Sequence, residues 1–378
     1  MPGRHNEKGQ ATQAHPRYFN QNLISQKDIN TSTLSALDRR LWFVLVTTMS
    51  VTVVKREFDK KSLRYALEEK NVPEMFVPAC FMRVNRGAKE AVRKLPLTYV
   101  FVHTTERCVA EIRKALPQLK LNAPISVVTG QRKHVTLHDG EMRMFRKIAD
   151  VFGGQLPCYP ADAFDVKACD RVRIVTGPFA GVEGAMVPSQ GKDGGLVVLP
   201  MRDLFCVSVG EQSPHNYKVL EFGKGSRHPY HEFDNYLPRV TAALRQRLTT
   251  GGIDDGIYAD VVKFVNRYSE LSARTLNIES MYCSLMLMSY AALGEDCVTW
   301  IDECKRLLPR LTADLQRALH QAIMYAATGD ETMARQLHGE IDKWGEIGAG
   351  DRKKRTVAAL LTEFESLYAI REARQIRV

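Results

Sequence analysis

The first part of the chain alternates apolar runs with segments of helical spacing. Residues 41–46 (LWFVLV) and 99–103 (YVFVH) are nearly continuous apolar runs, which predict buried strands. Residues 55–70 place Phe58, Leu63, Ala66 and Leu67 on one side of a helix and charged residues on the other. Shorter strands are expected at 75–78, 81–84 and 125–128, and helices at 108–116 and from 139 to about 151. This order predicts an α+β sandwich, with helices packed on an antiparallel sheet.

A glycine-rich hairpin is predicted between Asp170 and Val187. Residues 171–175 and 182–187 have the apolar pattern of two strands, and turn residues separate them. Further strands are expected at 196–199 and 204–209, which makes this region a small β-barrel. The residues that define the hairpin are Gly177, Pro178, Phe179, Gly181 and Gly184.

Beyond residue 237 the pattern becomes helical. Helices are expected at 257–268, 278–293, 298–308, 313–327, 332–344 and 352–374. The sequence YAALGED at 290–296 recurs as YAATGDE at 325–331, a shift of 35 residues. This period is close to that of tetratricopeptide-type helix pairs, but two copies are equally compatible with an ordinary helical bundle.

The predicted fold is therefore an α+β multidomain protein with a C-terminal all-α domain. Glycine, proline and polar residues mark the segments between the domains. The predicted divisions are a flexible arm at 1–40, an α/β sandwich at 41–152, a linker at 153–164, a β-barrel at 165–210, a second linker at 211–237 and a helical domain at 238–378.

The net charge of +10 is concentrated in the predicted sandwich. Residues 41–150 hold 20 Lys and Arg against 11 Asp and Glu, whereas residues 211–378 hold 22 against 23. A basic domain fits contact with a phosphate backbone or an acidic protein surface, although scattered surface charge would also explain it. No apolar run reaches the roughly eighteen residues of a membrane span, and the N-terminus does not resemble a signal peptide, so we expect a cytoplasmic protein.

No pattern in the sequence indicates catalysis. The chain has no phosphate-binding glycine loop, no HExxH and no GxSxG, so we expect neither catalytic residues nor an enzyme. The eight cysteines form no CxxC pair, and His103, His134 and His138 have no ligand partners at a known metal spacing. Buried reduced thiols, no metal and no cofactor are the expectation.

The sequence resembles the NusG family of transcription elongation factors in two places. The glycine hairpin at 170–187 resembles the KOW motif. Residues 42–46 (WFVLV), 76–78 (FVP), 96–102 (PLTYVFV) and the pair Glu141-Met142 match, in order, the N-terminal NGN domain of that family. One departure concerns the third match: the family usually reads Pro-Gly-Tyr or Pro-Asn-Tyr, whereas here Leu97-Thr98 stands between Pro96 and Tyr99. The last 140 to 165 residues lie outside the resemblance.

The resemblance implies a protein that acts by binding. An apolar face of the NGN-like sheet would bind RNA polymerase, through Val44, Val46, Leu97, Tyr99, Phe101 and Val127. Basic residues of the first helix would lie near the non-template DNA strand, namely Lys60, Lys61 and Arg64. The KOW-like barrel would contact a ribosomal protein, a termination factor or RNA, and the helical domain an unidentified protein.

Two functions follow from these expectations. The first is a specialised bacterial elongation or antitermination factor with an NGN-like domain, a KOW barrel and an added helical domain. The second is a KOW-containing ribosome-associated or RNA-binding protein in which the helical domain is a scaffold. An accessible apolar face on the NGN-like sheet distinguishes them, because an RNA-binding protein has no need of it.

Overall fold

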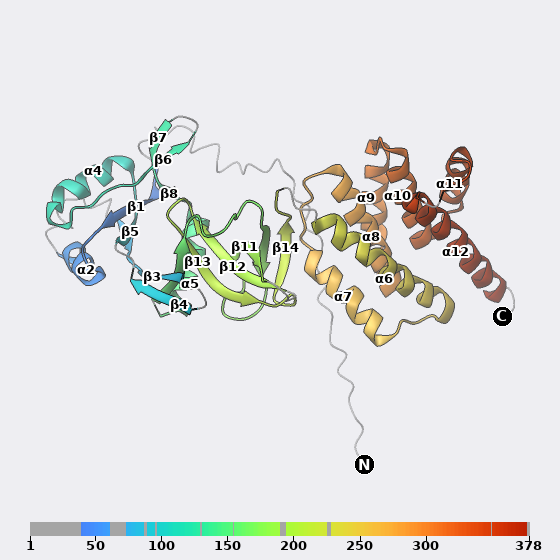
Figure 1. The fold of residues 1–378 in the computed structure, drawn as a ribbon, viewed down its shortest axis with the longest axis horizontal. Helices are drawn as coiled ribbons and strands as arrows, with labels where there is room; N and C mark the ends of the chain where they lie inside the picture. Colours follow the sequence, from blue (N-terminus) through green and yellow to red (C-terminus); the bar gives the residue numbers. More distant parts are fainter. Residues whose placement is uncertain are drawn as a thin grey trace, which may run out of the picture.

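Three regions follow one another along the molecule in the computed structural model (Figure 1). The structure describes residues 39–60, 73–86, 89–94, 97–128, 131–153, 155–189, 194–224, 228–348 and 350–375. We call residues 39–153 the N-terminal domain, residues 155–224 the β domain and residues 228–375 the helical domain. The β domain lies between the other two (Figure 1). The α+β multidomain fold with an all-α C-terminal region is confirmed.

The N-terminal domain is built on a four-stranded sheet. Its strand order is β2-β5-β1-β8, with β1 (Leu41–Thr47) paired antiparallel to β5 (Thr98–Thr104) along its whole length. The remaining elements of the domain are β2 (Glu74–Phe76), β3 (Ala79–Arg86), β4 (Lys89–Lys94), β6 (Ile125–Val128), β7 (Gln131–His134), β8 (Thr136–Leu137), α2 (Val51–Asp59), α4 (Glu106–Ala115), η1 (Pro117–Leu119) and α5 (Asp139–Val151).

Successive side chains of β1 and β5 point to opposite faces of the sheet and pack into two separate hydrophobic clusters. Phe43, Leu45 and the valines at 100 and 102 pack against the apolar sides of α2 and α4. Trp42 and Phe101 point to the opposite face, where α5 covers them. The sheet therefore has helices on both faces, and Ser50 and Thr105 cap the N-termini of α2 and α4 through their hydroxyls.

The β domain continues the sheet of strands β3 and β4. Its strands are β9 (Gln155–Pro160), β10 (Asp170–Ile174), β11 (Glu183–Pro188), β12 (Gly195–Met201), β13 (Phe205–Gln212) and β14 (Tyr217–Glu221). Together with β3 and β4 they pair in the order β14-β10-β11-β12-β13-β9-β3-β4. In this sheet β3 and β9 pair in parallel, and the other described pairs are antiparallel. The four strands predicted at 171–175, 182–187, 196–199 and 204–209 correspond to β10 through β13.

The two predicted linkers contain regular structure. Residues 153–164 include β9, and residues 211–237 include β14 and the first residues of a long helix. Proline and glycine content favoured linkers, but Leu156, Pro157 and Cys158 are buried between β13 and β3. Burial of a short apolar segment thus outweighs its turn-forming residues. The arm predicted at 1–40 lies outside the described residues except for its last two.

The helical domain consists of seven α-helices within the part of the chain that the structure describes. They are α6 (His228–Thr250), α7 (Asp255–Tyr268), α8 (Leu276–Leu293), α9 (Val298–Leu307), α10 (Asp314–Thr328), α11 (Glu331–Lys343) and α12 (Arg352–Gln375), with a 3-10 turn η2 (Leu308–Arg310) after α9. The six predicted helices match α7 to α12 within about three residues at each end. Helix α6 was not predicted.

The 35-residue repeat marks two equivalent helix ends. Gly294 and Gly329 follow α8 and α10 with φ of 75° and 72°, the left-handed conformation that glycine adopts at helix C-termini. Helices α8 and α10 pack against each other, and each also packs against the helix that follows it. Because α8 and α10 have neighbours on several sides, most of their residues are buried. The repeat is therefore a pair of helical hairpins that stack through their first helices.

A buried histidine joins three of these helices. His320 of α10 is 2% exposed. Its Nε2 lies 3.0 Å from the Cys304 carbonyl oxygen, so it must donate there, and its Nδ1 lies 2.6 Å from Ser284 Oγ and 3.0 Å from Ser280 Oγ. A neutral imidazole fits this arrangement, with Nδ1 accepting from one of the two hydroxyls. Burial lowers the pKa of His320 below its usual value of 6.5.

We predict that the helical domain loses stability as the pH falls below about 6.5. The unfolded chain then binds a proton at His320 that the folded chain excludes, so the free energy of unfolding decreases with falling pH. Chemical unfolding between pH 7.5 and 5.5 measures this slope. A His320→Asn variant should show a smaller slope, whereas substitution of the exposed His215 by Gln should leave it unchanged. Equal slopes in all three proteins would contradict this role.

A second prediction concerns Gly184 in β11. A Cβ at this position would lie 2.6 Å from the Val198 carbonyl oxygen of the neighbouring strand, closer than real contacts allow. Gly184→Ala should therefore lower the free energy of unfolding by about 1–3 kcal/mol. Gly140 in α5 has open space at its Cβ, so Gly140→Ala should leave stability unchanged or raise it by up to about 1 kcal/mol. Denaturant titration of both variants checks the contrast.

Candidate protein-docking cleft

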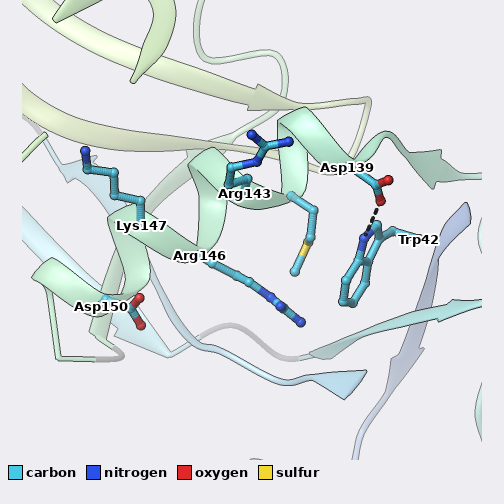
Figure 2. Close-up of a pocket in the computed structure, with 7 residues that line it drawn as sticks. Trp42, Asp139, Arg143, Arg146, Lys147 and Asp150 are labelled. Carbon is cyan, nitrogen blue, oxygen red and sulfur yellow. Dashed lines mark hydrogen bonds between the residues drawn. The ribbon is translucent and has the colours of Figure 1, made fainter. Parts of the chain in front are cut away.

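An open cleft of about 460 Å³ lies between α5 and Trp42 near the start of β1. Figure 2 shows α5 along one side and Trp42 of β1 on the other. Its lining residues are Trp42, Asp139, Met142, Arg143, Arg146, Lys147 and Asp150. Six of these seven residues belong to α5, so this helix determines the chemistry of the cleft.

The Trp42 ring is held between two other side chains. His103 stacks on it with ring centroids 5.0 Å apart, and the Arg146 guanidinium lies 4.4 Å from its centroid. The indole Nε1 donates to Asp139 Oδ1 at 3.1 Å (Figure 2). Arg146 also pairs with Glu74 of β2 at 2.5 Å. These contacts fix one wall of the cleft and leave Trp42 only 4% exposed.

The outer side of α5 carries a row of charged residues. Arg143, Lys147 and Asp150 are exposed, and the spacing of three and four residues places them along one side of the helix. Lys147 Nζ donates to the Ala180 carbonyl oxygen of the β domain. No hydrogen bond or ion pair to Arg143 occurs among the described residues. The cleft thus has the buried Met142 at its base, and its rim carries both cations and the exposed carboxylates of Asp139 and Asp150.

Four predicted polymerase-binding residues share one face of the sheet but are covered in this structure. Tyr99 and Phe101 are 8% and 0% exposed, and Val44 is 1% exposed. Val46 is partly buried against the same core. The prediction that these residues form an open apolar surface is corrected: the face packs against α5 and the β domain.

Two phenylalanines explain why this face is covered. Phe145 of α5 packs edge-on against Phe101 at 5.1 Å, and Phe205 of β13 lies 4.7 Å from Tyr99 between ring centroids. The amphipathic spacing of α5 was visible in the sequence, but the arrival of Phe205 from a distant strand had no local signal. The two other predicted residues are Leu97, which is 37% exposed, and Val127 in β6, whose side chain lies outside the described set.

The predicted nucleic-acid-binding residues are only partly described. Helix α2 ends at Asp59, and Lys61 and Arg64 lie outside the described residues. Lys60 pairs with Glu57 at 2.5 Å. Hydrogen bonds from Lys60 and then from Gln118 lower the pKa of Glu57. Lys60 therefore has a local partner in its own helix.

The residues of the predicted KOW motif form the turn between β10 and β11. Gly177 and Gly181 have φ of 72° and 87°, and the Gly181 amide donates to the Ile174 carbonyl oxygen at 2.7 Å. Phe179, which follows Pro178 in this turn, packs against Phe152 just beyond α5, with ring centroids 5.5 Å apart. The predicted turn is confirmed, and its tip contacts the N-terminal domain.

Charged side chains link the β domain to the helical domain. Arg173 of β10 pairs with Glu183 and with Glu270 after α7, and Glu270 also pairs with Lys218 of β14. Burial would raise the pKa of Glu183, but the hydrogen bonds and charges of Arg173 and Arg171 lower it overall. Beneath these pairs, Phe222 packs on Phe233 and Tyr268 of the helical domain.

Other candidate chemistry is limited to reduced thiols. All eight cysteines are free and six are buried, as the sequence predicts. Within the described residues, no three His, Cys, Asp or Glu side chains cluster in a way that could hold a metal ion. None of the helices in the described ranges has the length and apolar character required to cross a membrane.

Comparison with solved structures gives a partial structural likeness. No protein-family model and no curated protein matches the chain. Among solved structures, the chain is similar to the transcription anti-terminator antagonist UpxZ from Bacteroides uniformis. The match has 19% sequence identity and a TM-score of 0.26, and it covers 34% of this chain and 92% of that chain. A likeness of this size carries no argument about function.

We predict that Phe101 contributes to folding. Phe101→Ala should lower the free energy of unfolding by about 3–5 kcal/mol, because it leaves a cavity between Phe145 and the sheet. Leu97→Ala, at an exposed position before β5, should change it by less than about 1 kcal/mol. Urea unfolding monitored by circular dichroism checks both. A Phe101→Ala protein as stable as Leu97→Ala would show that α5 does not cover this face in solution.

Proposed function

We propose that the chain is a transcription elongation or antitermination factor that binds RNA polymerase in the cytoplasm through the cleft beside α5. The observation that carries the proposal is the order of its parts. Segments that resemble the NGN domain form a sheet with helices on both faces, and the segment that resembles the KOW motif forms the β10–β11 turn directly after it.

The cleft lies beside the sheet face that the resemblance assigns to polymerase, and none of the six residues assigned there lines it. Val44, Tyr99 and Phe101 of that face are buried, whereas Arg143 and Lys147 at the cleft rim are exposed. A partner helix at the cleft would therefore contact these exposed cations beside the ordered Trp42–Arg146 wall. Small preformed clefts with a rigid aromatic wall bind with little loss of conformational entropy.

The proposed mechanism requires only binding, and no covalent bond is made or broken. A protein that binds the elongating conformation of polymerase more tightly than the paused one shifts the population toward elongation. The β domain would recruit a ribosomal protein or a termination factor, and the helical domain a further protein through its stacked helical hairpins. The basic N-terminal domain would approach the non-template DNA strand.

A second candidate is a ribosome-associated or RNA-binding protein. The concentration of 20 Lys and Arg against 11 Asp and Glu in residues 41–150 favours it. Residues 165–210, which make up most of the β domain, carry no net charge, which argues against RNA as its main ligand. Binding to polymerase and to RNA can be measured on the same preparation.

Site-specific photocrosslinking tests the polymerase proposal. A benzophenone amino acid at position 143 should crosslink the full-length chain to bacterial core RNA polymerase, because this position is exposed at the cleft rim. The same group at position 107, on exposed α4 across the sheet, is the matched control and should crosslink at least about 5-fold less. The absence of any complex with polymerase, or equal crosslinking from both positions, would reject the proposal.

A further inference from the structure

We draw no further inference here: the strongest candidate, the basic first turn of α12 at residues 352–355 beside Trp344, rests on a helix N-terminus that also carries the carboxylate of Asp351, and nothing in the described part of the structure shows what it would bind.

Discussion

The packing of Phe145 holds the first two-thirds of the molecule together. This ring lies between Phe101 of the N-terminal sheet and Phe205 of the β domain, with ring centroids 5.1 Å and 6.1 Å away. Helix α5 therefore packs against both domains, and β9 pairs with β3 of the N-terminal domain and with β13 of the β domain. Because the side of α5 that carries Phe145 is buried, its opposite side, with Arg143 and Lys147, is the one left for a partner.

Local patterns predicted most of the secondary structure but not what covers each surface. The helices from α7 to α12 and the turn at Gly177 could be predicted because periodicity and turn residues are local signals. The burial of Tyr99 depends on Phe205, which is 106 positions further along the chain, and no local pattern reports such a contact. Strand β9 was missed for the same reason, since its two neighbours, β13 and β3, come from different domains.

The candidate cleft shows the same difference between what local sequence patterns predict and what tertiary packing determines. The sequence predicted that Val44, Tyr99 and Phe101 share one sheet face, because side chains alternate along the strands, and in the structure they do. It did not identify which residues remain accessible on that face. The Trp42–Arg146 stack joins residues from β1 and α5, and the pair of Arg146 with Glu74 adds a third segment. Such a cluster is specified by tertiary packing, so sequence spacing alone could not have revealed it.

The contacts of the β domain at both ends determine how far apart the functional surfaces lie. Its β10–β11 turn is tied to α5 through Lys147, and β14 is tied to the helical domain through Glu270 and Phe222. Side-chain contacts, and not only the chain connection, therefore join the β domain to both of its neighbours. If the α5 cleft and the helical domain each bind a partner, as proposed, these contacts would set the distance between the two partners (Figure 1).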